Sequence, residues 1–352
     1  MWVSLIRFKP RTKGAVKESR RVVVGGPYFE DLERGQVFDA PGLTLTWGHA
    51  AIHQAICGDR MLLPLDAGLC REVTGSENAL IHPNLVCDVA IGQSTEPTQR
   101  VLGNLFYRGL VLMRPVFRGE TLRTQTEIVA LKQNRPRDDG SASGLAVLRI
   151  QTRNQNEDAV LDFYRCPMIP MRDAAIATGH ADDFGEFSKE LDPERVRAAL
   201  PDWDWAALRS WVADPASLIE AGTVFEVEGR ESVTTSPELA RLTLNLAMTH
   251  RDPGAGRHGR RLVYGGQTIS IAVAHVTRAI PALATIIAWK SCDHSAPVFE
   301  GDVLSTEIEV LAVTEIEGGA SLADLRAVVH ADRGNSEAPE QVLDWVFVGV
   351  LA

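Results

Sequence analysis

A histidine, an asparagine and a pair of glycines lie close together in the second half of the chain. Asn245 precedes His250 by five residues, and the pair Gly265–Gly266 follows shortly afterwards. An imidazole exchanges protons near neutral pH, whereas a carboxamide can only orient water or substrate through hydrogen bonds. Backbone amides at the start of a helix are free to hold an oxyanion. These residue types therefore indicate proton-transfer chemistry beside a stabilised oxygen anion.

Two helices are expected to position these residues. The first is predicted to start at Ser236, as an N-cap followed by a proline, and to carry Asn245 in its last turns. His250 then lies on the segment that leaves the helix, so both side chains can turn into one cleft. Asp252, with the proline and glycine after it, prevents the helix from continuing. Asp252 either fixes the tautomer of the imidazole or only stops the helix.

A second helix is predicted over 268–280, directly after the glycine pair. It is apolar on nearly all sides and is ended by Pro281, which indicates a helix buried against a sheet. Four segments with polar interruptions follow and are typical of strands with one solvated face: 285–289, 303–313, 322–331 and 341–349.

An internal repeat sets the domain organisation. The segment Pro115–Leu122 recurs as Pro297–Leu304, and Glu127–Leu131 recurs at the same offset as Glu309–Val313. A period this long indicates two copies of one domain rather than a solenoid. The predicted units are a basic arm (1–27), a first domain (28–172), a linker with short helices and the tryptophans Trp203, Trp205 and Trp211 (173–217), and a second domain (218–352).

Composition excludes several functional classes. The chain has 45% hydrophobic and 23% charged residues, and no apolar run approaches the roughly 20 residues of a membrane span. A formal net charge of -10 disfavours nucleic acid as a partner. The five cysteines lack the close pairing of a disulfide framework or a zinc site, and no phosphate-cradling glycine loop is recognisable. We expect a cytoplasmic protein without a metal or redox cofactor.

Two basic clusters stand out against this acidic background. The N-terminal arm is either a solvated tail or a binding element. Arg257, Arg260 and Arg261 lie between the histidine and the glycine pair, where their guanidinium groups could bind the phosphates of a nucleotide. The alternative for these three is a surface loop with ordinary solubilising charge.

The segment from Leu244 to Pro253 resembles the motif of the MaoC-like enoyl-CoA hydratases, Gly-Asp-x-Asn-Pro-x-His-x-Asp-Pro. His250 falls on the catalytic histidine of that motif, and Asn245 stands where simple members carry the catalytic aspartate. Tyr264-Gly265 takes the place of the later His-Gly pair. The segment Gly256–Gly266 and the sequence His294-Ser-Ala-Pro-Val-Phe look more like the mesaconyl-CoA hydratase (β-methylmalyl-CoA dehydratase) branch. The resemblance covers the chain from Tyr28 onward.

This resemblance implies an α+β fold, a tandem (double) hotdog in which each half wraps an antiparallel sheet around a long central helix. It also implies a hydro-lyase that interconverts an enoyl-CoA and a 3-hydroxyacyl-CoA, with mesaconyl-CoA and β-methylmalyl-CoA as the expected pair. His250 would accept and donate the protons of the reaction, and the amide of Gly265 or Gly266 would hold the thioester oxygen. Tyr264 and His294 are possible supporting residues. The CoA thioester is the substrate, and no separate cofactor is expected.

The first copy keeps only part of this motif. Asp59 matches the family aspartate, but Pro64 occupies the histidine position. His82-Pro83 stands opposite Tyr264-Gly265, and a proline has no amide hydrogen to offer an oxyanion. We therefore assign catalysis to the second half. Asp59 is expected to hold backbone or Arg60 in place at a helix end.

Three alternatives remain on the same fold: a general (R)-specific enoyl-CoA hydratase, a thioesterase, and a non-catalytic acyl-CoA-binding module. A thioesterase would call for a carboxylate on the central helix, and 268–280 contains neither Asp nor Glu. The incomplete Asp/His pairs of both copies favour the binding module. Because a tandem hotdog already contains the pairing that single hotdogs obtain by dimerising, both a monomer and a homodimer are open.

Overall fold

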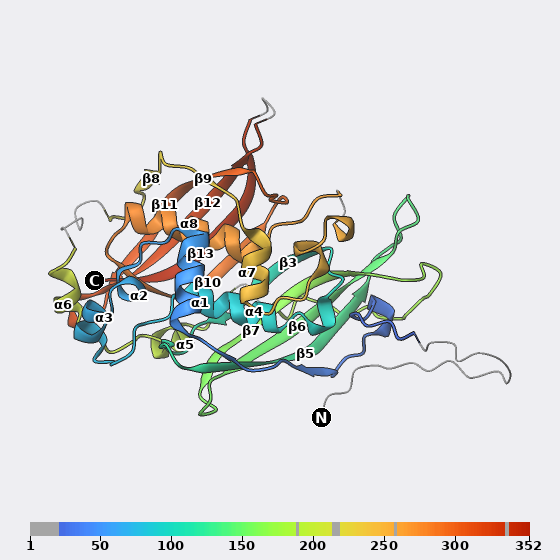
Figure 1. Ribbon diagram of the computed structural model, residues 1–352, viewed down its shortest axis with the longest axis horizontal. Coiled ribbons are helices and arrows are strands. Elements are labelled where there is room, and N and C mark those ends of the chain that lie inside the picture. Colours follow the sequence, from blue (N-terminus) through green and yellow to red (C-terminus); the bar gives the residue numbers. More distant parts are fainter. Residues whose placement is uncertain (1–20, 188–189, 213–218, 257–258, 335–337) are drawn as a thin grey trace.

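Two antiparallel sheets with helices packed against them make up the computed structural model, which describes residues 21–187, 190–212, 219–256, 259–334 and 338–352 (Figure 1). Most of the basic arm and Arg257 lie outside the described residues. The predicted α+β class is confirmed. None of the helices in the described part of the chain is long and apolar enough to span a membrane.

The first half forms a six-stranded sheet in the order β1-β5-β6-β7-β3, with β2 paired to β5. Its central helix, α4 (Pro83–Gln93), is buried along its whole length. The strands are β1 (Val37–Asp39), β2 (Leu43–Thr44), β3 (Gly103–Arg108), β5 (Thr121–Gln133), β6 (Ser143–Arg153) and β7 (Ala159–Pro170), and the outer helices are α1 (Trp47–Cys57), α2 (Leu62–Leu65) and α3 (Ala67–Thr74).

The second half repeats this arrangement around the helix α8 (Gly265–Ala279). Its seven-stranded sheet has the order β4-β10-β13-β12-β11-β8, with β9 paired to β11. The elements are β8 (Val224–Glu226), β9 (Glu231–Ser232), α7 (Ser236–Leu242), β10 (Leu283–His294), β11 (Val303–Glu315), β12 (Ser321–Asp332) and β13 (Glu340–Leu351). The four strands predicted from the sequence correspond to β10 to β13, and each observed strand is a few residues longer than predicted.

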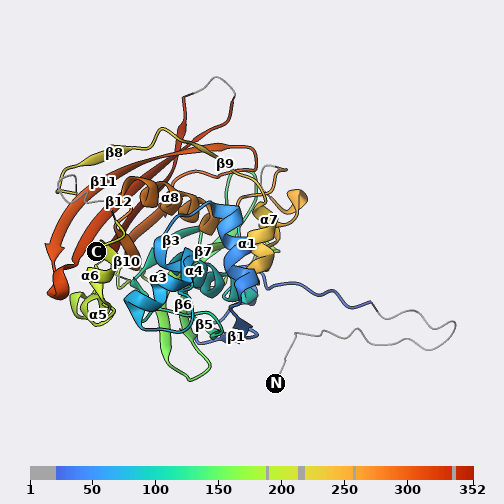
Figure 2. The same ribbon diagram turned by 60° about the vertical axis from the view of Figure 1, so that its left-hand side comes forward.

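The two halves are joined along their sheets and through their central helices. Strand β4 (Leu110–Val111) follows β3 in the chain but pairs with β10 of the other half. Gly109 lies between β3 and β4 with a φ of 65°, a conformation that glycine adopts without steric cost. Helices α4 and α8 contact each other, and α1 contacts α8 (Figure 2). The residues at the starts of α4 and α8 therefore lie at the junction of the halves.

Two short helices, α5 (Pro193–Ala198) and α6 (Trp205–Arg209), lie in the stretch between the halves. Trp203 and Trp205 are buried in a cluster with residues from both halves, in line with the expected packing by tryptophan. Trp211 differs from that expectation, because 60% of it is exposed. The exact domain boundaries stay a prediction.

Candidate functional site

The helix before His250 is shorter than the sequence predicts. Helix α7 ends at Leu242, so Asn245 lies beyond it rather than in its last turns, and Thr235 rather than Ser236 is the N-cap. The cause is a Schellman ending: the Asn245 amide donates to Ala240 O at 2.8 Å while Leu244 takes a φ of 58°. Glycine normally occupies that left-handed position, so a leucine there gives no sequence signal.

Asn245 shapes the turn that carries His250. Its side chain is 1% exposed, and its Oδ1 accepts a hydrogen bond from the Ala247 amide at 2.9 Å. Ala247 O in turn accepts from the His250 amide at 3.2 Å, within a turn of 3₁₀ helix over Met248–His250. The Met248 amide donates to Gln99 O at 2.8 Å and anchors this turn to the first half.

His250 has one ring nitrogen held by a hydrogen bond, and the other has no hydrogen-bond partner among the residues that the structure describes. Its Nδ1 lies 2.8 Å from Leu262 O, and since a carbonyl only accepts, Nδ1 carries the proton. The lone pair of the neutral ring is therefore on Nε2. The side chain is 8% exposed; burial is the main cause that lowers its pKa to about 4, and the charge of Arg165 adds to it. His250 is thus a neutral base at physiological pH.

The start of α8 offers free backbone donors. The helix begins at the predicted glycine pair, three residues earlier than the apolar run, with Tyr264 as N-cap. The Tyr264 hydroxyl donates to Asp88 O on α4 at 3.0 Å, so it does not cap its own helix. Within the described residues, neither the Gly265 nor the Gly266 amide donates a hydrogen bond. Two N–H groups and the positive end of the helix dipole remain available to an anion.

These groups converge as the sequence predicted. The rings of His250 and Tyr264 have centroids 5.4 Å apart. A Cβ placed on Gly265 would lie 2.7 Å from His294 Nε2, so His294 covers the start of α8. His250 also lies close enough to His294 to lower the pKa of that residue. The structure therefore brings His250, Tyr264, Gly265 and His294 together, with Asn245 behind the turn.

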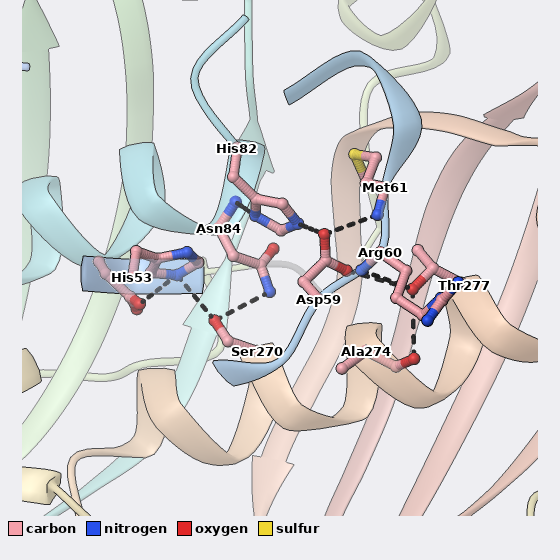
Figure 3. Close-up of polar contacts among 10 residues, drawn as sticks. His53, Asp59, Arg60, Met61, His82, Asn84, Ser270, Ala274 and Thr277 are labelled. Atoms are coloured by element: carbon pink, nitrogen blue, oxygen red, sulfur yellow. Dashed lines mark hydrogen bonds and ion pairs between the residues drawn. The ribbon is translucent and has the colours of Figure 1, made fainter. Parts of the chain in front are cut away.

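The equivalent place in the first half is built differently (Figure 3). His82 caps its own helix, because its Nδ1 accepts from the Asn84 amide at 3.1 Å, and Pro83 has no amide hydrogen. Asp59 lies 3.0 Å from His82 Nε2 and accepts from the Met61 amide at 2.8 Å. At the two positions that correspond to Gly265 and Gly266, α4 therefore has a proline without an amide hydrogen and an amide that already donates to His82.

Asp59 keeps its negative charge in this buried setting. Burial alone would raise the pKa of Asp59, but the charge and hydrogen bond of His82 and the Met61 amide lower it below its usual value. The predicted role of holding backbone is confirmed by the Met61 contact. The contact with Arg60 differs: its amide donates to Thr277 Oγ1, which itself donates to Asp59 Oδ1. His82 as a partner was not foreseen.

Two further predicted site residues have other partners. Asp252 accepts from the Gly254 amide at 2.9 Å, whereas the imidazole of His250 is held by Leu262. Asp252 therefore caps a turn and does not fix the tautomer. Arg261 forms an ion pair with Glu300, and the Arg260 guanidinium stacks 4.2 Å above the Phe299 ring. A role of these arginines in binding CoA phosphates stays a prediction.

Asp88 is a buried carboxyl that was not predicted from the sequence, because it lies on the central helix of the first half. Asp88 lies on α4, is 1% exposed and packs against Gly266. Its Oδ2 lies 3.8 Å from His53 Nε2. Burial raises its pKa well above the usual value.

Arg165 is a second residue that the sequence did not reveal. It lies on β7, is 3% exposed, and donates to Ser94 Oγ, Ser94 O and Thr98 Oγ1 at 2.8 to 2.9 Å. All of these partners are neutral, and no carboxylate pairs with Arg165 in the described part of the chain. Its only sequence signal is an arginine inside a strand of alternating apolar residues.

Comparison with known proteins identifies the family of this chain. The family model described as mesaconyl-CoA hydratase matches residues 10–323. The chain belongs to the mesaconyl-CoA hydratase family. It is therefore a member of a group of hydro-lyases, as the sequence motif predicted. A β-methylmalyl-CoA dehydratase of Chloroflexus aurantiacus is 28% identical over 89% of this chain and 91% of the relative. A mesaconyl-CoA hydratase of Cereibacter sphaeroides is 27% identical over 86% and 89%.

Solved structures confirm the tandem hotdog. RV0216, a conserved hypothetical protein of Mycobacterium tuberculosis with a double hotdog fold, is 45% identical, with a TM-score of 0.85 over 93% of this chain and 99% of that chain. A putative MaoC domain dehydratase from Chloroflexus aurantiacus is 24% identical and has a TM-score of 0.77 over 93% and 97%; at this identity it supports the fold alone. This member of the family thus has the expected architecture.

Proposed function

We propose that the second half catalyses the reversible hydration of a branched dicarboxylic enoyl-CoA, with mesaconyl-CoA and β-methylmalyl-CoA as substrate and product. The observation that carries this proposal is the neutral His250, whose free Nε2 lies in the same site as the two free amides of α8. The named relatives support this pair of thioesters. No cofactor is required beyond the thioester itself.

The chemistry follows from the positions of these donors and acceptors. His250 Nε2 takes a proton from water as the hydroxyl oxygen bonds to the β-carbon of the enoyl group. The electron pair of the double bond moves toward the thioester oxygen, where the Gly265 or Gly266 amide stabilises the negative charge. The imidazolium then returns a proton to the α-carbon. The sum is the addition of one water, and the reverse sequence removes it.

Asn245 acts in this proposal as a positioning residue. Its carboxamide cannot exchange protons at neutral pH, and its Oδ1 is already bonded to the Ala247 amide. It fixes the turn from which His250 reaches the site. One imidazole therefore serves as both base and acid in the two half-reactions, where simple members divide the roles between an aspartate and a histidine.

Arg165 favours an acyl group that carries its own carboxylate. A buried guanidinium without an acidic partner is costly, and a substrate carboxylate would offset that cost through charge-assisted hydrogen bonds. Nη1 donates no hydrogen bond within the residues that the structure describes. This distinguishes a dicarboxylic substrate from the fatty acyl chains of a general (R)-specific hydratase.

Replacing Arg165 by Met is expected to raise KM for mesaconyl-CoA by about tenfold or more while changing KM for crotonyl-CoA, which lacks the carboxylate, far less. The expected size follows from the roughly 1.5 to 3 kcal/mol that a hydrogen bond to a charged group contributes. Steady-state kinetics with both substrates provides the measurement. An equal loss with both substrates would show that Arg165 only supports the segment around Ser94.

The assay that tests the proposed function follows the absorbance of the enoyl-thioester band with purified protein and mesaconyl-CoA. Decay of the band to an equilibrium value, with formation of the hydroxyacyl-CoA, is the expected result. If acyl-CoA thioesters bind in calorimetry but no enoyl-CoA is ever hydrated, the non-catalytic binding module is the correct reading. Hydration of crotonyl-CoA in preference to mesaconyl-CoA would favour the general hydratase.

The lowered pKa of His250 predicts an unusual dependence on pH. His250 must be neutral to accept a proton, so a pKa of about 4 keeps kcat/KM level as the pH falls through 6.5 and lets it decline only toward pH 4. An ordinary histidine would lose half of this activity near pH 6.5. Initial rates measured from neutral to acidic pH check this, and an acid limb centred near pH 6.5 would contradict it.

Protein stability must be followed in the same experiment. In the unfolded chain the histidines take up protons as the pH falls below about 6.5, whereas buried His250 and His294 remain neutral down to about 4. The free energy of unfolding is therefore expected to decrease across this window. Tryptophan fluorescence reports the folded fraction, and rates are divided by that fraction.

A further inference from the structure

We propose that His294 is a second catalytic residue, whose Nε2–H donates a hydrogen bond to the thioester oxygen beside the amide donors of α8. This inference rests on the proposed hydration reaction and concerns the charge that develops during it. The sequence analysis placed His294 only among possible supporting residues. The structure assigns a specific atom and a specific step to it.

The position of the ring carries the argument. His294 is the last residue of β10, and its Nε2 is buried with no hydrogen-bond partner within the described part of the chain. A Cβ on Gly265 would lie 2.7 Å from His294 Nε2 and 2.9 Å from Cε1, so this edge of the ring lies against the start of α8. A buried polar atom without a partner is costly, and here it lies beside two other free donors.

The charge state of the ring fits a donor rather than a base. Burial lowers the pKa of His294 to about 4, and the neighbouring His250 adds to this effect, so the ring is neutral at physiological pH. A neutral imidazole can give an N–H to an oxygen without adding a buried positive charge. His250 differs because Leu262 O fixes its proton on Nδ1 and leaves its Nε2 as an acceptor.

The first half lacks an equivalent of this histidine. His294 stands three residues before the repeated Pro-Val-Phe at Pro297, and Leu112 stands three residues before the same sequence at Pro115. The first half, in which Pro83 offers no amide hydrogen, therefore has leucine at the position of His294. The half with free amides at Gly265 and Gly266 has histidine. The two kinds of donor occur together, which is expected if both stabilise one oxygen.

The step assigned to His294 involves no proton transfer. As the water oxygen bonds to the β-carbon and His250 takes the proton, the electron pair of the double bond moves onto the thioester oxygen. His294 Nε2–H and an amide of α8 donate hydrogen bonds to that oxygen and keep their protons. When the α-carbon is protonated, the electron pair returns and these hydrogen bonds weaken.

The test uses two variants and a thioester that cannot react. His294→Leu removes the donor, and His294→Gln returns an N–H near the ε position. The probe is succinyl-CoA labelled with carbon-13 at the thioester carbonyl, whose infrared stretch falls in frequency when donors polarise it. The bound probe is expected to show the full shift in the wild type, a smaller one in His294→Leu, and partial recovery in His294→Gln.

The value of kcat should decrease in the variants in the same order as the shift of the carbonyl stretch. Loss of one oxyanion donor lowers kcat by about 10²- to 10³-fold, and KM should change far less. The inference is overturned if His294→Leu keeps the wild-type carbonyl stretch or the wild-type kcat. If His294→Leu does not fold, His294→Gln carries the test: a carbonyl shift smaller than that of the wild type together with a lowered kcat supports the inference, and a wild-type carbonyl stretch or a wild-type kcat overturns it. A wild type that hydrates no enoyl-CoA contradicts the proposed function instead, whatever the carbonyl spectrum shows.

Discussion

Replacing His250 by Asn is expected to lower kcat for enoyl-CoA hydration by about 10²- to 10⁴-fold, the usual contribution of a general acid-base residue. Asparagine places an N–H near the position of Nδ1, so it can still donate to Leu262 O, but it has no counterpart of Nε2. The turn should therefore persist while the base is lost. Binding of succinyl-CoA, measured by calorimetry, should change little.

A matched histidine elsewhere provides the control. His330 lies on β12, where it stands opposite Ser305 and Gln341 of the neighbouring strands. His330→Ala is expected to keep wild-type kinetics, which excludes a general effect of removing an imidazole. Wild-type turnover in His250→Asn would show that another group carries the proton, and the assignment of the base would be wrong.

Replacing Gly266 by Ala is expected to reduce the free energy of unfolding by about 1 to 3 kcal/mol, the usual cost of overpacking a filled core. The added methyl group would overlap Asp88 Oδ1, and both residues lie in the interface of α4 and α8. Activity should fall as well, since the start of α8 must move. Urea denaturation followed by tryptophan fluorescence measures the change.

The partner of the clash can be removed in the same background. In the Asp88→Ala background, adding Gly266→Ala is expected to cost much less free energy of unfolding than it does in the wild type. The carboxyl group that the new methyl group would overlap is then absent, so the two changes are coupled. An unchanged urea midpoint in the single Gly266→Ala variant would mean that the two helices pack less closely than described here.

Much of the architecture was predictable because it depends on local pattern. Strands β10 to β13 and the helix α8 follow from alternating or continuous apolar residues, and the tandem organisation follows from the repeat of Pro115–Leu122. The grouping of His250 with the glycine pair was also foreseen. These features need only the periodicity of one segment or a comparison of two.

The missed features depend on contacts between distant segments. The end of α7 is set by Leu244 in a left-handed conformation that its residue type disfavours. The pairing of Asp59 with His82 joins two segments of the first half that are 23 residues apart, and the packing of Asp88 against the start of α8 requires the two halves to be placed against each other. A single sequence contains no signal for such tertiary pairs, so Arg165 and Asp88 became visible only in the fold.

The two copies differ at one decisive place, the start of the central helix. In the first half, His82 satisfies an amide of its own helix and Pro83 supplies none. In the second half, Tyr264 directs its hydroxyl to the other helix and leaves the amides of the glycine pair free. The second half therefore offers two unbonded amides at positions where the first half, within the residues that the structure describes, offers none.

Incorporation of oxygen-18 from labelled water into the hydroxyacyl-CoA that forms from mesaconyl-CoA, compared between His250→Asn and His82→Asn, tests the central claim most directly. Asparagine at position 82 can still cap α4, since it is a preferred N-cap residue. We predict that His82→Asn yields the labelled hydroxyacyl-CoA at the wild-type rate and that His250→Asn yields almost none. Labelling that survives in His250→Asn but disappears in His82→Asn would place the active site in the first half and contradict the account.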